Sequence, residues 1–444
     1  MNQIKPPILD AKDRINNIDE IEQTYTSEQA VLESIRCLSC KDAPCSRKCP
    51  VEMDIPAFIT AIKENDFEKA KKIIELHNFL GDICGRVCPQ ELQCQSTCVK
   101  GIKGEPISIG RLERFVCDQK IKTLMPEDER SDKRVAIIGS GPAGLTCAAA
   151  VSLKIKNVDI YEASSDAGGV LRYGIPEFRL PNRIIDKKIR MLKKFDVNFL
   201  TDTSVGKDIF FAELKEKYDA VFIAGGAEVP KTMDIKGIDL TGVYNAGEIL
   251  AHFNTLFLEH SHHSCSSFEE KNVAVIGAGN VAMDAASVAL RLGAKSVKII
   301  YRRTLAEAPA RQDEIEHAKD EGAEFVELAG ITEIFGADRV EKVIAKKMTL
   351  GEPDEDGRRV PIETDKVIEI PVDCVIMAIG QDVTPVRIAG LEQDERGRII
   401  VDDRMRTSIP NVYAGGDITR GSATVILAMR DGRIAGEEIV KSLE

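Results

Sequence analysis

The chain has 444 residues, more than one hydrophobic core usually holds, so two or three domains are expected. Its hydrophobic content of 43% and charged content of 30% are ordinary for a soluble protein, and neither a membrane-span pattern nor a signal-peptide pattern is present, so a cytoplasmic protein without a membrane partner is expected. The formal net charge of −12 argues against nucleic acid as a partner, because phosphate binding needs a basic face.

The first part of the chain predicts helices. Residues 1–24 are polar and charged, which indicates an arm or an ill-ordered lead-in. The segments IPAFITAIKEN and DFEKAKKIIELHNFL then place apolar residues at helical spacing, with Asn65 and Asp66 as candidate N-caps between them. The polar run 123–133 contains a proline and suits a linker.

Eight of the twelve cysteines fall in two short runs within this helical part. The first run has the spacing C-x2-C-x4-C-x3-C and the second C-x3-C-x5-C-x3-C. Cysteines crowded in this way in a cytosolic protein indicate metal rather than disulfides. Runs that contain Cys-Pro are typical of iron–sulfur proteins, in which one run can serve two clusters. A pair of zinc sites is the alternative, although zinc favours paired C-x2-4-C knuckles separated by a longer loop. Either Cys84 or Cys88 could instead be a buried residue that packs in the core and binds no metal.

Alternating strands and helices follow, which predicts parallel sheets. The segment RVAIIGSGPAGLTCAAAV reads as a buried strand, a turn with Gly139, Gly141 and Gly144, and an apolar helix. Such glycines make a tight turn, admit a pyrophosphate at the helix N-terminus and allow close helix packing. Glu162 ends the next strand, where an acid can accept both ribose hydroxyls. Strand, turn, helix and acid together predict a dinucleotide site.

A second strand–turn–helix unit contains Gly277 and Gly279. The strand after it ends without an acid and is followed by Arg302 and Arg303 instead. Arginine forms forked, charge-assisted hydrogen bonds with a phosphate, so this pattern favours NADPH over NADH, with Arg311 as a candidate third contact. The alternative is that these arginines only form a solvated surface.

Near the end of the chain, Gly416 and Asp417 follow another strand, and a helix begins near Thr424. An acid at this place can bind the ribityl chain of a flavin, and the helix N-terminus can stabilise negative charge on the reduced ring. We therefore expect an α + α/β fold, in which an all-helical domain (1–128) precedes two Rossmann-like domains. The flavin domain would comprise 129–250 and 379–444, with the NAD(P)H domain (251–378) inserted in it.

From about Ala30 onward, the sequence resembles the family that contains the NAD(P)H-oxidising part of dihydropyrimidine dehydrogenase and the small subunit of glutamate synthase. The segments that carry the resemblance are RCLSCKDAPCSRKCP, ICGRVCPQELQCQSTC, ISIGRLERF, GGVLRYGIPEFRLP, GAGNVAMD and AGGD. The segments DAPC and FITAI are more similar to the dihydropyrimidine dehydrogenase branch, whose bacterial members have a separate subunit of about this size. That subunit is usually NADH-linked, whereas the arginines at the second site favour NADPH.

The resemblance implies two 4Fe–4S clusters with crossed ligation. One would take Cys37, Cys40, Cys45 and Cys98, and the other Cys49, Cys88, Cys94 and Glu113, with Cys84 as a non-ligand. It also implies that Arg179 lies near the flavin. With the motifs, it yields the expected cofactor-binding residues Gly139, Gly141, Pro142, Ala143, Gly144, Glu162, Gly169, Arg179, Gly277, Gly279, Asn280, Val281, Arg302, Arg303, Arg311, Gly380, Gly416, Asp417 and Thr424.

The expected reaction path is hydride transfer from NAD(P)H to FAD, then single electrons through the two clusters. No residue is predicted to act as a general acid or base, because hydride transfer depends on positioning. The chain ends soon after the flavin helix, so a separate catalytic subunit carrying FMN is expected, in a hetero-oligomer that reduces uracil or thymine. The alternatives are an input subunit of glutamate synthase, a ferredoxin-linked NADPH enzyme, or a zinc-stabilised nucleotide-binding regulator. A loop with His260, His262, His263 and Cys265 is expected to be a polar surface loop rather than a metal site.

Overall fold

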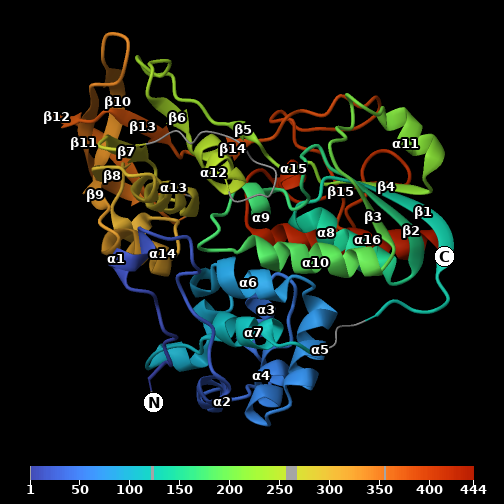
Figure 1. The fold of residues 1–444 in the computed structure, drawn as a ribbon. Helices are drawn as coiled ribbons and strands as arrows, with labels where there is room; N and C mark the ends of the chain where they lie inside the picture. The colour runs from blue at the N-terminus through green and yellow to red at the C-terminus, as the bar shows by residue number, and fades with distance from the viewer. Residues whose placement is uncertain (1, 122–124, 257–267, 355–356) are drawn as a thin grey trace.

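The computed structural model describes residues 2–121, 125–256, 268–354 and 357–444. A helical domain, at the bottom of Figure 1, lies beneath two sheet-containing domains that sit beside each other above it. The α + α/β fold expected from the sequence is confirmed. Within the described ranges, no helix is long and apolar enough to span a bilayer.

The helical domain is built from short helices. Its elements are α1 (Ala11–Arg14), α2 (Ser27–Ile35), α3 (Pro44–Lys48), α4 (Ile55–Lys63), α5 (Phe67–His77), α6 (Gly81–Val87), η1 (Gln90–Leu92), η2 (Gln95–Thr97), η3 (Val99–Ile102) and α7 (Ile109–Asp118). Of these, α2, α4, α5 and α7 form its apolar core. Asp54 and Asp66 cap α4 and α5 by accepting hydrogen bonds from backbone N–H groups at 3.2 and 2.9 Å. Of the two predicted N-caps, Asp66 serves as one, whereas Asn65 lies just outside the helix.

The N-terminal residues form an arm, one of the two alternatives that their composition left open, and this arm is fixed along the helical domain and the second sheet domain. Ile21 is 4% exposed and lies in the apolar core of that sheet domain. Its backbone N–H donates to the Phe178 carbonyl at 3.1 Å. The Arg291 guanidinium donates to the Asn17 carbonyl at 3.3 Å. Composition could not predict this path, since isolated apolar residues in a polar segment carry no periodic signal.

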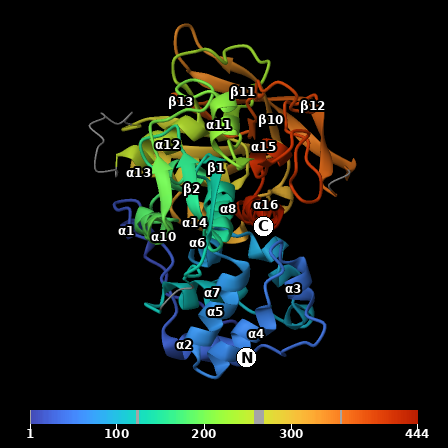
Figure 2. The ribbon, with the colours of Figure 1, turned by 90° about the vertical axis from the view of Figure 1, so that its right-hand side faces the viewer.

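The first sheet domain has a parallel sheet in the order β15-β4-β1-β2-β3. Its elements are β1 (Ser131–Ile138), α8 (Pro142–Ser152), β2 (Ile155–Tyr161), α9 (Val170–Tyr173), α10 (Asn182–Lys194), β3 (Val197–Leu200), α11 (Phe211–Lys217), β4 (Ala220–Ile223), β15 (Val412–Ala414), α15 (Asp417–Arg420) and α16 (Val425–Leu443). Helix α6 of the helical domain contacts both α10 and α16, and Figure 2 shows it just below them. The flavin motifs therefore lie close to the cysteine-rich domain.

The second sheet domain repeats this plan, with a parallel sheet in the order β6-β13-β7-β8-β9. Its elements are β6 (Val243–Asn245), α12 (Ala246–Thr255), β7 (Asn272–Ile276), α13 (Asn280–Arg291), β8 (Ser296–Tyr301), η4 (Leu305–Glu307), α14 (Gln312–Asp320), β9 (Glu324–Glu327) and β13 (Cys374–Met377). The chain leaves the first sheet after β4 and returns to it at β15, so the second unit is inserted in the first. Strands β5 (Val229–Pro230) and β14 (Gln381–Asp382) pair where the chain passes between the domains.

An antiparallel sheet of β10 (Ala329–Phe335), β11 (Lys342–Pro353) and β12 (Arg359–Pro371) packs on the second sheet and was not predicted. Val343 and Ala345 are buried in a core shared with β7. The other face of this sheet is exposed, with Ile362 52% accessible. Its strands alternate apolar and charged residues, a pattern weaker than the continuous apolar runs of the parallel strands.

Candidate functional site

The turn after β1 has the geometry of a dinucleotide-binding loop. Gly139 has φ +99°, and a Cβ there would lie 2.4 Å from the Ala224 carbonyl oxygen. A Cβ on Gly144 would lie 2.0 Å from the Gly139 carbonyl oxygen, so α8 can approach the strand only with glycine there. A Cβ on Gly141 would meet nothing within 4 Å. The space at Gly141 faces the N-terminus of α8, which begins with Pro142, and the residues present fit a bound pyrophosphate.

Glu162 lies beside this turn, directly after β2, and is 7% exposed. One carboxylate oxygen accepts hydrogen bonds from the backbone N–H of Ser140 at 3.1 Å and from its hydroxyl at 2.5 Å. The Ser140 hydroxyl in turn accepts from the Gly168 N–H at 2.8 Å. A Cβ on the neighbouring Gly169 (φ +52°) would lie 3.0 Å from the Gly141 Cα. Ser140 thus orients the acid, a role that sequence reasoning missed although this serine stands inside the glycine motif.

The C-terminal motif reaches the same place through α16. A Cβ on Gly432 would lie 2.1 Å from the Ala143 carbonyl oxygen, so α8 and α16 pack closely. Gly416 has φ +78°, and Asp417 follows it at the start of α15. Burial raises the pKa of Asp417 to about 6. The hydroxyl of Thr424, the N-cap of α16, is buried without a hydrogen-bond partner in the described ranges. An unpaired hydroxyl and a half-buried acid near a helix N-terminus fit a polar flavin cofactor.

Asp431 supports this C-terminal motif and was also missed by sequence reasoning. It is fully buried and accepts hydrogen bonds from the Gly416 N–H at 3.1 Å and from the Arg420 guanidinium at 2.6 Å. The buried carboxylate therefore holds the Gly416 turn in place. The spacing of an acid within the predicted last helix is too ordinary a pattern to have revealed it.

The second glycine turn repeats the first, at the junction of β7 and α13. Gly277 has φ +128°, and a Cβ there would lie 2.4 Å from the Ala378 carbonyl oxygen. Gly279 again faces open space, with nothing within 4 Å of its ideal Cβ. The Asn280 side chain accepts a hydrogen bond from the Arg311 N–H at 2.9 Å, and Val281 is 46% exposed beside it. The residues at this turn fit a second dinucleotide.

The three arginines predicted at this second site lie in different surroundings. Arg302 is exposed just after β8 and makes no hydrogen bond or ion pair with any described residue. Arg303 is buried, and its guanidinium donates to the Arg359 carbonyl at 2.7 Å and pairs with Asp354 at 2.9 Å. The Arg311 guanidinium donates a hydrogen bond to the Arg86 carbonyl of the helical domain at 2.7 Å. Arg302 is thus the most accessible of the three, and the contacts of Arg303 and Arg311 with a ligand stay predictions.

Gly380 lies at the passage between the two sheet domains. It has φ +102°, and its carbonyl accepts a hydrogen bond from the Lys231 N–H at 3.1 Å. Its position is therefore set by the pairing of β5 and β14, which connects the two domains.

The first set of predicted cluster ligands surrounds one recess. Cys37, Cys40, Cys45 and Cys98 all line the same recess. The rest of the wall is largely apolar and includes Ile55 and Ile59. Burial raises the pKa of the Cys37 thiol, and the nearby Cys98 and Cys40 raise it further. The fourth cysteine comes from the second run, so the structure brings together the crossed set that the resemblance implies, and its chemistry fits an iron–sulfur cluster.

The second set gathers closer to the flavin domain. Burial raises the pKa of the Cys49 thiol to about 11, with Glu113 as a further cause. Burial raises the pKa of the Cys94 thiol as well, and the neighbouring Cys49 and Glu113 raise it further. Burial also raises the pKa of Glu113 to about 8. The Glu113 carboxylate accepts a hydrogen bond from the Asn78 amide at 2.7 Å. A buried carboxylate among thiols fits a metal-bound position.

Cys88 and Cys84 are neighbours on this side of the domain. The Cys84 thiol is 1% exposed and donates to the Met429 sulfur on α16 at 3.3 Å. The hydrogen bond with Cys84 and burial raise the pKa of Cys88. Cys84 thus already has a contact with the flavin domain, in keeping with the non-ligand position that the resemblance implies.

Two further observations concern single metal ions. In the part of the chain that the structure describes, no three His, Cys, Asp or Glu side chains converge on a position for one ion. The loop with His260, His262, His263 and Cys265 lies outside the described residues, so its expected role stays a prediction.

Arg179 lies at the contact between the sheet domains. Its guanidinium pairs with Asp284 of α13 and Glu314 of α14. These contacts point it toward the second sheet domain rather than toward the glycine turn of the first. Its expected place near the flavin stays a prediction.

Comparison with known proteins places this geometry in a family. Residues 133–432 match the family described as pyridine nucleotide-disulphide oxidoreductase. The chain belongs to this family. Residues 14–125 match a second family, described as dihydropyrimidine dehydrogenase domain II, 4Fe-4S cluster. The chain is therefore an NAD(P)H-dependent oxidoreductase with FAD and 4Fe–4S clusters as cofactors.

Individual relatives cover nearly the whole chain. It is 34% identical over 462 residues to the glutamate synthase [NADPH] small chain of Escherichia coli, covering 100% of this chain and 98% of that one. It is also 34% identical over 434 residues to the NAD-dependent dihydropyrimidine dehydrogenase subunit PreT of Escherichia coli, covering 97% and 98%. Among solved structures, FprA of Mycobacterium tuberculosis in complex with NADPH has a TM-score of 0.60 at 23% identity and covers 70% of this chain and 85% of that one. That last likeness concerns the fold.

Proposed function

We propose that this protein is the electron-input subunit of a larger enzyme. Bound FAD would accept a hydride from NAD(P)H and release electrons singly to two 4Fe–4S clusters. The chain's own residues would bind and orient the cofactors. The turns at Gly141 and Gly279 would hold the two dinucleotides, and Glu162 would accept hydrogen bonds from the ribose of the flavin nucleotide. No general acid or base is required of the protein.

The observation that carries this proposal is the spatial order of the sites. Cys88 lies in the same apolar core as α8 and α16, which frame the flavin motifs. Cys49 packs against both that core and the core of the helical domain. Cys37 and Cys98 pack only against the latter core. The second cysteine set thus stands between the flavin motifs and the first set, which is the order that stepwise electron transfer requires.

The first set also lies next to the outer surface of the helical domain. Its recess is lined by Leu38 and Val99, which are 57% and 39% exposed. Electrons arriving there would be close to the protein surface, where a partner could accept them. We therefore place a separate catalytic subunit, carrying FMN, beyond this recess in a hetero-oligomer.

For the terminal reaction we propose the reduction of uracil or thymine to the dihydropyrimidine. Two features support it: the match of residues 14–125 to a dihydropyrimidine dehydrogenase domain, and the extent of the alignment with PreT, whose name denotes such a subunit. A second candidate, the small subunit of glutamate synthase, is favoured by Arg302. This exposed arginine lies one residue beyond the position where an NADH-binding protein would carry an acid, and the relative with that function is named for NADPH.

The test begins with the purified chain under anaerobic conditions. Addition of NADPH or NADH should bleach first the flavin and then the cluster absorbance, and the nucleotide that saturates at lower concentration is the physiological one. The polypeptide that co-purifies with the chain is then assayed with uracil, or with glutamine and 2-oxoglutarate. Reduction of uracil by the isolated chain would contradict the need for a partner, and absence of flavin and iron–sulfur colour would contradict the redox function.

A further inference from the structure

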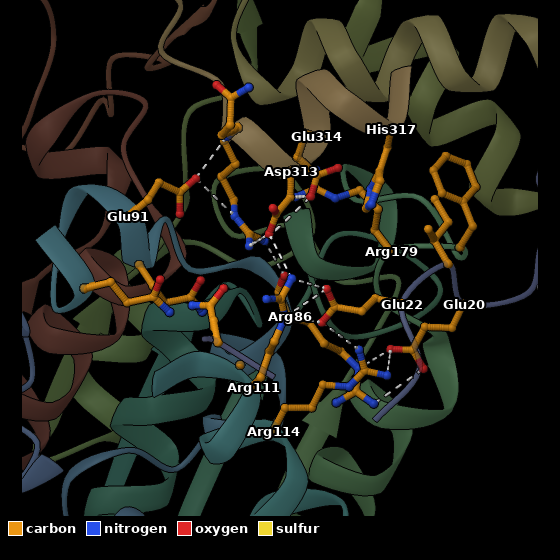
Figure 3. Close-up of a pocket in the computed structure, with 18 residues that line it drawn as sticks. Glu20, Glu22, Arg86, Glu91, Arg111, Arg114, Arg179, Asp313, Glu314 and His317 are labelled. Carbon is orange, nitrogen blue, oxygen red and sulfur yellow. Dashed lines mark hydrogen bonds and ion pairs between the residues drawn. The ribbon is translucent and has the colours of Figure 1, made fainter. Parts of the chain in front are cut away.

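A buried group of ion pairs joins the two nucleotide-binding domains. Arg179 lies between α9 and α10 of the flavin domain, and its Nη1 atom lies 2.7 and 2.6 Å from the two carboxylate oxygens of Asp284. Its Nη2 atom lies 3.0 Å from a carboxylate oxygen of Glu314. The three side chains are 7%, 4% and 9% exposed. Figure 3 shows Arg179 beside Glu314 at the edge of the charged pocket between the domains.

The residues on either side of Arg179 are anchored in different domains. Phe178 lies in the apolar core of the NAD(P)H domain, with its ring edge-on to Phe253 at a centroid distance of 6.2 Å. The Arg291 guanidinium lies over the Phe178 ring at 3.8 Å. Leu180 lies in the core of the flavin domain. Successive residues therefore attach the segment 178–180 to both domains, and its backbone has little freedom to shift.

The partner helix α13 leads directly to the nucleotide-binding turn. It begins at Asn280, immediately after Gly279, and Asp284 stands about one helical turn further on. Asn280 is itself held by the backbone N–H of Arg311, which precedes α14. A helix is stiff over this length, so a displacement at Asp284 moves the turn at Gly279 as well.

Net stability is a poor explanation for such a group. Removing several charges from water costs about as much as their attraction returns, and apolar replacements of buried ion pairs are often as stable. The planar guanidinium is, however, directional, because its Nη1 atom must face Asp284 while its Nη2 atom faces Glu314. The group is therefore better suited to setting an orientation than to adding stability.

We propose that Arg179 is a positioning residue for hydride transfer, which holds α13 and the dinucleotide at its N-terminus in one orientation relative to the flavin. This inference rests on the proposed transfer of a hydride from NAD(P)H to FAD. Misplacing reacting groups by about 1 Å can cost roughly 100-fold in rate. Binding of the dinucleotide, in contrast, depends on the turn at Gly279 and would be little affected.

The test uses the full chain with its flavin and clusters and compares Arg179→Lys and Asp284→Asn with the parent protein. Lysine keeps the charge but cannot face Asp284 and Glu314 with two separate nitrogens, and asparagine keeps the shape but loses the charge. Arg183→Lys is the matched control, because this nearby arginine is 66% exposed and pairs with Glu20 at 3.1 Å. Anaerobic stopped-flow measurements give the limiting rate of flavin reduction per bound FAD and the apparent Kd for NADPH and NADH.

Both variants should lower the limiting rate by about tenfold or more while changing the Kd by less than about threefold, with the control unchanged in both. Hydrogen exchange on the resting proteins is a second readout that needs no turnover. It should be faster in α13 and in the segment 176–181 of both variants, and unchanged in the control.

Unchanged limiting rates and unchanged exchange would overturn the proposal. So would loss of bound FAD or of folding in both variants, since Arg179 would then be a structural residue. If neither nucleotide reduces the flavin of the parent protein, the proposed function fails instead, and the exchange measurement still decides whether Arg179 fixes the domain orientation.

Discussion

Replacing Gly141 with alanine should separate FAD binding from folding. Gly141 has φ −69° and ψ −173°, which alanine also adopts, and its ideal Cβ meets nothing within 4 Å. The stability of the FAD-free protein should therefore change by less than about 0.5 kcal/mol. The methyl group would instead stand where the pyrophosphate of the flavin nucleotide must approach the backbone.

The loss in affinity follows from the hydrogen bonds at stake. A hydrogen bond to a charged group contributes about 1.5–3 kcal/mol, and displacing the phosphates should weaken one or two of them. A loss of about 3 kcal/mol corresponds to roughly 100-fold weaker binding of FAD. Calorimetric titration of the FAD-free protein with FAD measures this loss, and urea denaturation of the same sample measures the stability.

Gly144→Ala is the matched control, with the opposite expectation. Its Cβ would lie 2.0 Å from the Gly139 carbonyl oxygen, so the overlap should destabilise even the FAD-free protein by about 1–3 kcal/mol. If Gly141→Ala bound FAD as tightly as the parent protein, the assignment of this turn to the flavin nucleotide would be wrong. If it unfolded as readily as Gly144→Ala, the open space at Gly141 would have been misjudged.

Three further predictions concern the other sites. Glu113→Ala should change the electron paramagnetic resonance spectrum of one reduced cluster and spare the other, and unchanged spectra for both would refute its role as a ligand. Arg302→Ala should raise the KM for NADPH about tenfold or more and leave that for NADH nearly unchanged, since only NADPH carries the 2′-phosphate, whereas Arg303→Ala should mainly lower the melting temperature. Burial raises the pKa of Asp417 from 3.8 to about 6, so its contribution to stability is present below pH 3.8 and is lost as the pH rises through about 6. Asp417→Asn should therefore stabilise the FAD-free protein at pH 8 by at most about 3 kcal/mol, an advantage that disappears near pH 4, while FAD binding weakens. A constant stability difference across this pH range would contradict that account.

Local chemistry made much of the fold predictable from the sequence. A glycine turn between an apolar strand and an apolar helix is specified by neighbouring residues, and the structure has it at both Gly139 and Gly277. The cap at Asp66 is likewise a contact between near neighbours, with the N–H of Lys69. Parallel sheets followed from the alternation of strands and helices. Cysteine spacing indicated metal for the same reason, because thiolates a few residues apart can surround one centre.

Other features depended on contacts between distant parts of the chain. The sequence alone predicted one group of three arginines, yet Arg311 donates to the carbonyl of Arg86, which lies 225 residues away. The N-terminal segment could be predicted only as an arm or an ill-ordered lead-in, because its polar composition does not reveal that Ile21 enters the core of another domain. The sequence by itself thus determined which chemistry the chain can hold, since motifs are local. Only the tertiary structure decided which side chains are free to perform it and how the domains are oriented, because those outcomes depend on burial and on pairing between residues far apart in the chain.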